Sequence, residues 1–250
     1  MTGTDTLFFD ADGTILDFRK TEREALESLR GSIETSLPPE EFRKAYHGVN
    51  DRLWVELEQG AVSASELKIE RFRRFADLLN IPTAPEALSD LYLKRLGEGS
   101  YFLPGALEML RKLKGHYRMA VLTNGLTVVQ EARFNRPEFR ELFEQVLISE
   151  KEGTAKPDAD MFRRAADRMG MPLSDRIMMI GDSLTSDIAG GINAGIRTCW
   201  YNPGGWKNQS PWKPDMEASG FDELLKMLLP GTAPPAEEEE RDGQAVRLSR

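Results

Sequence analysis

The sequence has one cysteine, no excess of basic charge and no long apolar run, and each of these deficits excludes a class of protein. The single cysteine, Cys199, cannot form an internal disulfide, which excludes a disulfide-stapled scaffold. The 41 acidic residues outnumber the 33 basic ones and give a net charge of -8. This balance argues against binding a nucleic acid polymer, because such binding depends on Lys and Arg side chains that neutralise phosphates. A small anion held at one site is still compatible with it.

The length and hydrophobic pattern of the chain predict its cellular location and the number of its domains. No apolar stretch reaches the ~18 residues of a membrane span, and the N-terminal residues lack the basic and apolar segments of a signal peptide. We therefore expect no membrane partner and a cytoplasmic location. With 250 residues, 40% of them hydrophobic, the chain can bury one good core and a smaller second domain. The Pro- and Glu-rich residues 230–250 are expected to form a disordered tail.

The most informative stretch is the apolar run 7–9, which is followed at once by Asp10, Asp12 and Thr14. Such a run fits a strand of a parallel sheet that is covered on both faces, and ligands collect beyond the carboxyl ends of such strands. Two carboxylates two residues apart repel each other unless they share a cation or a proton. The stretch thus indicates metal binding or acid/base chemistry, although taken alone it also fits a plain strand and an Asp-Gly turn. A calcium loop is excluded, because Ile15 and Thr21 occupy the positions where that loop needs Gly and Glu.

Residues 19–99 change in texture to charged helical stretches without strand signals. Thr21 and Glu24 have the spacing of a capping box, as do Ser63 and Glu66. Helices are also expected from about residue 39 to 59 and from about 85 to 96, each starting at a proline. Four helices with short connections predict a small bundle.

From about residue 101 onward, strand and helix patterns alternate, which is typical of a parallel α/β sheet. Apolar runs at 119–122, 146–148, 177–180 and 198–201 are the expected strands. Right-handed crossovers would bring their ends to one edge of the sheet. Besides Asp10 and Asp12, the residues expected at that edge are Thr123, Asn124, Lys156, Asp182 and Asp187.

These residues occur in four ordered motifs that resemble those of the haloacid dehalogenase-like hydrolase superfamily. The motifs are Asp10-Ala11-Asp12-Gly13-Thr14, Thr123-Asn124-Gly125, Lys156-Pro157 and Gly181-Asp182-Ser183-Leu184-Thr185-Ser186-Asp187. The resemblance implies a Rossmann-like parallel core formed by residues 1–18 and 100–229, with an inserted α-helical bundle, residues 19–99, as its cap. Within the superfamily, residues 50–80, 148–150 and 190–200 resemble the pyrimidine 5'-nucleotidase-like branch.

The resemblance also implies a role for each motif residue. Asp10 would attack phosphorus and form an aspartyl phosphate, and Asp12 would act as the acid and base. Thr123 and the main-chain amide of Asn124 would hydrogen-bond the phosphoryl oxygens, and Lys156 would neutralise their charge.

Mg²⁺ is the expected cofactor, because it is a hard ion that takes oxygen ligands. The implied ligands are Asp10, the main-chain carbonyl of Asp12 and Asp182. Asp187 would act through water or by orienting Lys156. The dehalogenases of the superfamily lack an acid at the position of Asp12, so its presence favours phosphate ester hydrolysis.

Three other interpretations fit the sequence less well. Gly181-Asp182-Ser183-Leu184 also matches the nucleophile block of the GDSL esterases, but both histidines, His47 and His116, lie upstream of Ser183 instead of near the carboxyl end. A phosphorylated receiver module would need an aspartate at the end of a later strand, and Asp51 falls in the helical insert. A non-catalytic binding protein is disfavoured because every motif residue is retained.

The expected substrate is a small phosphorylated molecule, most of all a pyrimidine nucleoside monophosphate; the alternative is a metabolite such as phosphoglycolate or a sugar phosphate. Phe18, Asn50, Trp54 and Arg71 are candidates to contact a nucleoside, because aromatic rings stack on bases and amide or guanidinium groups bind their edges. The helical spacing of Trp54 and Phe72 nevertheless favours a place in the core of the bundle over a contact with the nucleoside. The sequence indicates no oligomeric state.

Overall fold

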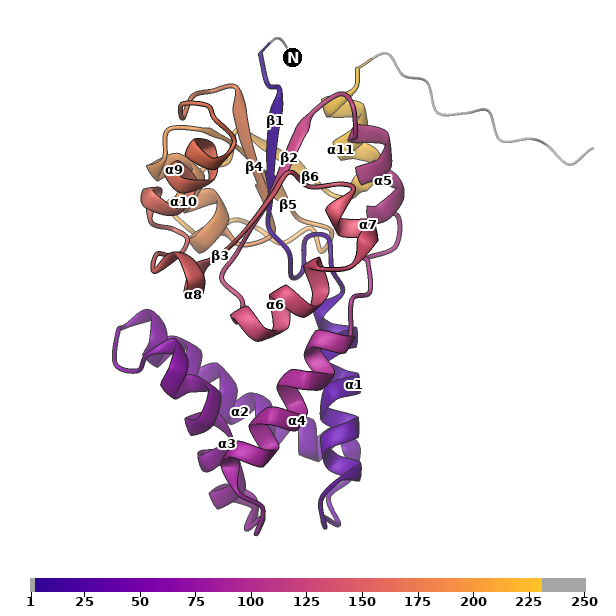
Figure 1. Cartoon of the computed structure of the whole chain (residues 1–250), viewed down its shortest axis with the longest axis vertical. Coiled ribbons are helices and arrows are strands. Elements are labelled where there is room, and N and C mark those ends of the chain that lie inside the picture. The colour runs from indigo at the N-terminus through magenta and orange to yellow at the C-terminus, as the bar shows by residue number, and fades with distance from the viewer. Residues whose placement is uncertain (1–2, 231–250) are drawn as a thin grey trace, which may run out of the picture.

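The computed structural model describes residues 3–230; the expected disordered tail, from residue 231 onward, lies outside the described residues. The described chain forms a parallel sheet with strand order β3-β2-β1-β4-β5-β6. Its strands are β1 Thr6–Phe9, β2 Arg118–Thr123, β3 Gln145–Ile148, β4 Ile177–Gly181, β5 Arg197–Tyr201 and β6 Met216–Ala218. The predicted α/β fold with a parallel sheet is confirmed, and β1 lies in its interior between β2 and β4 (Figure 1).

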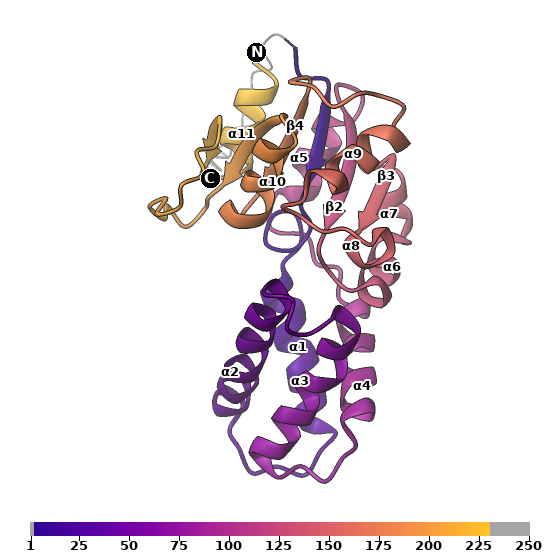
Figure 2. The same ribbon diagram turned by 90° about the vertical axis from the view of Figure 1, so that its left-hand side faces the viewer.

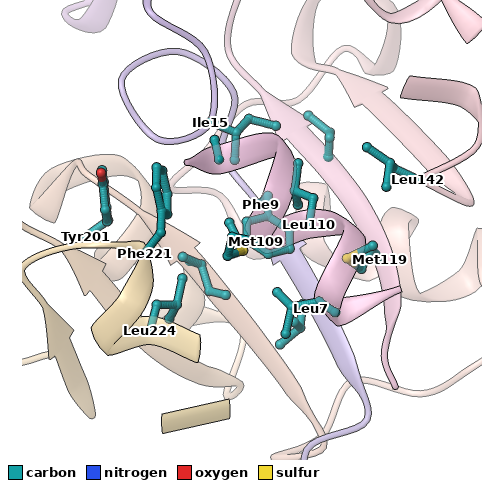
Figure 3. Close-up of a cluster of buried hydrophobic side chains, with 14 of the residues drawn as sticks. Leu7, Phe9, Ile15, Met109, Leu110, Met119, Leu142, Tyr201, Phe221 and Leu224 are labelled. Carbon is teal, nitrogen blue, oxygen red and sulfur yellow. The ribbon is translucent and has the colours of Figure 1, made fainter. Parts of the chain in front are cut away.

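Helices cover both faces of the sheet, which explains why β1 is apolar throughout. Leu7 and Phe9 pack on one face against α5, Ala106–Leu113, and α11, Phe221–Leu228 (Figure 3). Phe8 points to the other face, against α9, Ala159–Arg168. All three side chains are fully buried, and burying each contributes about 1.5–3 kcal/mol. The buried strand thus anchors the carboxylates that follow it.

Four long helices form a separate lobe below the sheet in Figures 1 and 2. They are α1 Phe18–Gly31, α2 Pro39–Glu58, α3 Ala64–Leu79 and α4 Pro85–Glu98. The lobe has its own core, in which Tyr46, Phe72, Phe75 and Tyr92 contact one another. The same core includes Leu126, which precedes α6 (Thr127–Phe134), and Val129 in its first turn. Helix α6 therefore joins the lobe to the sheet.

The capping signals had different outcomes. The capping box of Ser63 and Glu66 is present, with the Ser63 hydroxyl accepting from the Glu66 amide at 3.2 Å. The capping box predicted for Thr21 and Glu24 is wrong. α1 begins earlier, because Asp17 caps it by accepting from the Lys20 amide at 2.9 Å, and Thr21 lies inside the helix.

The remaining elements are short, and several had no counterpart in the sequence prediction. They are α7 Pro137–Arg140, α8 Ser149–Glu152, the π-helical turn η1 Leu184–Ile188 and α10 Ala189–Asn193. Among the described residues no helix has both the length and the apolar character needed to cross a membrane.

Candidate active site

Asp10 follows β1 directly, and both its main chain and its carboxylate are hydrogen-bonded. Its amide donates to the Ile180 carbonyl at 2.9 Å and so continues the pairing of β1 with β4. One carboxylate oxygen accepts from the Lys156 ammonium at 2.6 Å, and the other accepts from the Thr14 hydroxyl at 3.2 Å. Because the side chain is largely buried and bonded at both oxygens, its orientation is fixed before any ligand binds.

Lys156 is the countercharge at the centre of the site. It is only 4% exposed, and its ammonium donates to Asp10 at 2.6 Å, Asp187 at 2.7 Å and the Leu122 carbonyl at 2.7 Å. These three acceptors use all three of its protons. Although burial favours the neutral amine, the carboxylates of Asp10 and Asp187 raise the pKa of Lys156 above its usual value. Lys156 is therefore a permanent cation here.

Asp10, Asp182 and Asp187 form an acidic cluster, with one carboxylate oxygen of each lying within 4.8 Å of the others. Asp182 is exposed to solvent on one side, but desolvation of its carboxylate within the cluster and the charges of Asp10 and Asp187 raise the pKa of Asp182 to about 7. Burial likewise raises the pKa of Asp187 to about 6, against the attraction of Lys156. Three carboxylates facing one ammonium leave an excess of negative charge on oxygen ligands, so the set fits a hard divalent cation.

Asp182 is positioned by groups from the turn that follows β1 and from β5. Its amide donates to the Thr14 hydroxyl at 3.1 Å, and its carbonyl accepts from the Trp200 indole at 2.9 Å. Gly13 lies against its carboxylate so closely that a Cβ at position 13 would be 2.6 Å from the carboxylate oxygen, and its φ is +93°. The glycine after Asp12 is therefore required by both space and backbone conformation.

Asp12 lies outside the acidic cluster. Its two oxygens accept from the Arg133 guanidinium and from the Gln130 amide, each at 2.7 Å. Burial and the charge of Asp10 raise the pKa of Asp12, and Arg133 opposes this shift. Gln130 and Arg133 come from adjacent turns of α6 and were not among the predicted site residues.

Thr123 and Asn124 lie at the end of β2, as predicted. The Thr123 hydroxyl accepts from the Gly125 amide at 3.0 Å and from Gln130 at 3.1 Å. The Asn124 side chain makes two hydrogen bonds to the main chain of Lys156, at 2.8 and 3.0 Å. This side chain holds the Lys156 loop, so the main-chain amide is the part of Asn124 to which the predicted phosphoryl contact applies.

A cavity of ≈ 240 Å³ lies between this edge of the sheet and the helical lobe. It is lined from the sheet side by Asp10, Asp12 and Thr123, and from the lobe by the four predicted nucleoside contacts Phe18, Asn50, Trp54 and Arg71. Phe72 is instead fully buried in the lobe core. A larger hollow of ≈ 790 Å³ lies over α2 and α3, but none of the predicted catalytic side chains lines it.

Comparisons with known proteins agree with this geometry. The family model described as haloacid dehalogenase-like hydrolase matches residues 4–195. The pyrimidine 5'-nucleotidase YjjG of Escherichia coli is 34% identical over 90% of this chain and 97% of its own length, and the pyrimidine 5'-nucleotidase PynA of Streptococcus pneumoniae is 34% identical over 89% and 94%. A structure of the putative HAD-hydrolase YfnB of Bacillus subtilis, described as bound to magnesium and as revealing interdomain movement, superposes with a TM-score of 0.83 at 30% identity, covering 91% of this chain and all of that one.

Proposed function

This chain belongs to the haloacid dehalogenase-like hydrolase family, and we propose that it is a Mg²⁺-dependent phosphomonoesterase acting on nucleoside 5'-monophosphates, above all those of pyrimidines. One observation carries the proposal: the carboxylates of Asp10 and Asp12 have separate environments. Asp10 lies in the acidic cluster against Lys156, whereas Asp12 lies apart from it against α6 and borders the cavity. A departing alkoxide needs a proton and a departing halide does not, so a second acid at the cavity wall favours ester hydrolysis.

Asp10 is the proposed nucleophile. Its carboxylate oxygen forms a bond to phosphorus while the bond between phosphorus and the ester oxygen breaks, which gives an aspartyl phosphate and an alcohol. Asp12 gives its proton to the leaving oxygen and later removes a proton from the water that hydrolyses the aspartyl phosphate. Its raised pKa supports this role, because the group must be protonated in one half of the cycle and ionised in the other.

The acidic cluster is the proposed metal site. Asp10 and Asp182 would hold Mg²⁺ together with the main-chain carbonyl of Asp12, and Asp187 would orient Lys156, to which it is hydrogen-bonded at 2.7 Å. When bound, Mg²⁺ would offset the negative charge of both nucleophile and phosphoryl group. Lys156 offers its charge to the phosphoryl oxygens, and Thr123 and the Asn124 amide offer hydrogen bonds to them.

We further propose that residues 19–99 act as a cap and that residues 1–18 and 100–229 are the catalytic core. Two observations support this division: the helices of the lobe share one hydrophobic core, and the cavity lies between lobe and sheet. The interdomain movement described for the Bacillus subtilis structure suggests that this lobe also moves relative to the sheet. Such movement would admit the substrate and then exclude water from the aspartyl phosphate.

The proposal is tested by measuring phosphate release from UMP, CMP, AMP, ribose 5-phosphate and phosphoglycolate, with Mg²⁺ and with EDTA. We expect the highest kcat/KM for UMP and CMP, and no turnover in EDTA. Equal or faster turnover of ribose 5-phosphate or phosphoglycolate would favour the small-metabolite alternative. No release from any ester would leave a non-catalytic binding protein as the better interpretation.

A further inference from the structure

Arg71, on α3, is a buried cation with an unused hydrogen-bonding edge. Its residue is 3% exposed and lines the cavity between lobe and sheet. One terminal nitrogen, Nη1, donates to the Asn50 side-chain oxygen at 3.1 Å. The other two nitrogens, Nε and Nη2, are buried and have no hydrogen-bond partner among the residues that the structure describes. Buried charged donors without acceptors are costly, so a ligand that accepts from them would recover that cost.

The unused nitrogens act as one unit. In a guanidinium group the Nε and Nη2 hydrogens lie in one plane and point the same way, so they can converge on one carbonyl oxygen or meet two neighbouring acceptors. The group is also held in orientation. Its central carbon lies 5.1 Å from the Tyr92 ring centroid and 5.4 Å from that of Phe72, within the range of cation–π attraction.

The acidic group nearby is already bonded to other residues. Glu22 lines the same cavity, and its carboxylate accepts from the Tyr92 hydroxyl at 3.2 Å and lies 3.5 Å from His47 Nε2. Burial raises the pKa of Glu22, and the charges of His47 and Arg71 oppose this shift. No described residue forms an ion pair with Arg71, so a ligand in the cavity can supply the acceptor that its Nε and Nη2 lack.

We infer that this edge of Arg71 binds the ring carbonyl of a pyrimidine base and so sets the base preference of the enzyme; the inference rests on the proposed function. Cytosine, uracil and thymine all carry a carbonyl beside the glycosidic nitrogen, whereas adenine has no carbonyl. Phe18 and Trp54 line the cavity and offer aromatic surface to a planar ring. The volume of ≈ 240 Å³ lies below the ~300–1,000 Å³ usual for ligand pockets, which suits a single ring better than a purine.

A ligand carboxylate could also accept from Nε and Nη2 of Arg71, so the experiment has to distinguish a carboxylate from a ring carbonyl. Two variants are measured, Arg71→Met, which removes the charge, and Arg71→Lys, which keeps the charge but loses the planar edge. The matched control is Arg74→Met, one turn-length further along α3, because Arg74 pairs with Glu56 at 2.7 Å and with Glu70 at 2.9 Å and does not line the cavity. Thermal unfolding of each variant reports on the fold.

For UMP and CMP we expect kcat/KM to fall about 100-fold in both Arg71 variants, as when a charged hydrogen bond is lost. Ribose 5-phosphate carries the same reacting ester without the base, and its kcat/KM is expected to stay unchanged. Uridine is expected to bind the wild type and Arg74→Met and to lose that binding in Arg71→Lys.

Two outcomes would overturn the inference. If the Arg71 variants lower kcat/KM by the same factor for UMP and ribose 5-phosphate, Arg71 acts only on the structure. If wild-type turnover is fastest with phosphoglycolate and Arg71→Lys selectively removes it, the edge binds a carboxylate. Failure of the wild type to hydrolyse any nucleotide would instead overturn the proposed function itself.

Discussion

Asp10 and Asp12 are two residues apart, yet their side chains have different partners because the chain turns after β1. Asp10 stays in the line of the sheet and pairs with Lys156, whereas Asp12 is carried to α6 and pairs with Arg133. The presence of two carboxylates at a strand end could be predicted from the sequence. Lys156 could likewise be placed at this edge of the sheet, but the partners of Asp12 could not, because Gln130 and Arg133 are more than 100 positions further along the chain. Arg71 could be named as a nucleoside contact, but its unpaired nitrogens are visible only in the structure.

Asp10→Asn is expected to abolish turnover of every phosphate ester while leaving the fold intact. The amide keeps the shape of the side chain but is far too weak a nucleophile to form the phosphoenzyme. Lys156 keeps its hydrogen bonds to Asp187 and to the Leu122 carbonyl, so the buried ammonium is still paired. Phosphate release and thermal unfolding are measured together, and substantial residual activity in a folded variant would reject Asp10 as the nucleophile.

The raised pKa of Asp182 predicts how the metal-free protein responds to pH. Its folded-state value of about 7 lies above the ordinary value of 3.8, so between these limits the folded state binds more protons than the unfolded state. The contribution of this group to stability therefore decreases as pH rises from about 4 to about 7. Asp182→Asn removes that contribution; because Asp182 is exposed and water screens its charge, in EDTA we expect only a small rise in Tm relative to wild type at pH 8, which is lost by pH 5.

Mg²⁺ provides the control for the Asp182 prediction. A bound cation favours the ionised carboxylate, so saturating Mg²⁺ at pH 8 is expected to stabilise wild type more than Asp182→Asn. An Asp182→Asn advantage in EDTA that is the same at pH 5 and pH 8 would contradict the assigned cause.

Local signals explain which elements were predictable. A helix-starting proline marked α2, and the box of Ser63 and Glu66 marked α3. α6 was missed because its buried face includes Gln130 and Arg133 and so does not read as an apolar stripe. β6 was missed because it is only three residues long. The misplaced start of α1 has a similar cause, since two capping signals four residues apart competed and Asp17 prevailed.

The pairing of Arg133, on α6, with Asp12 predicts an effect on proton transfer that can be measured separately from phosphate binding. Arg133→Met removes one of the two groups that hold Asp12, so we expect kcat to fall at least about tenfold for alkyl phosphates with little change in KM, part of the ~10²–10⁴ of general acid catalysis. With p-nitrophenyl phosphate, whose leaving group needs no proton, the loss should be much smaller. Arg136→Met is the control, because Arg136 is partly exposed, donates to the Glu98 carbonyl and makes no contact with Asp12. Equal losses for both substrates would refute this positioning role.

At the scale of the whole molecule, the site depends on two lobes meeting at one edge of the sheet. Asp10, Asp12 and Thr123 reach the cavity from the ends of β1 and β2, whereas Trp54 and Arg71 reach it from the helical lobe. The resemblance of the motifs predicts a cap at residues 19–99, inserted directly after the first motif, and this division stays a prediction. The contacts between the lobe and the sheet join residues far apart in the chain, so no local sequence pattern predicts them.

One such contact is the ion pair between Lys68 on α3 and Glu150 on α8, at 2.6 Å. The same carboxylate accepts from the Thr127 amide at 2.8 Å, so the pair joins the lobe to the start of α6. Both side chains are partly exposed, and such pairs contribute about 0.2–1 kcal/mol. If the lobe opens to admit substrate, this energy favours the closed arrangement, in which the cavity is complete.

Lys68→Met is therefore expected to raise KM for UMP by up to about fivefold, since 1 kcal/mol shifts an equilibrium by roughly that factor, while kcat and the Tm change little. Lys151→Met is a matched control, because Lys151 makes an equally short pair, 2.6 Å, with Glu131, and that pair joins α8 to α6 without crossing to the lobe. Small-angle scattering should show a more extended average shape for Lys68→Met only. Because the two ion pairs have the same length and chemistry, equal effects on KM would mean that surface charge near the site matters and that the link between the lobes does not.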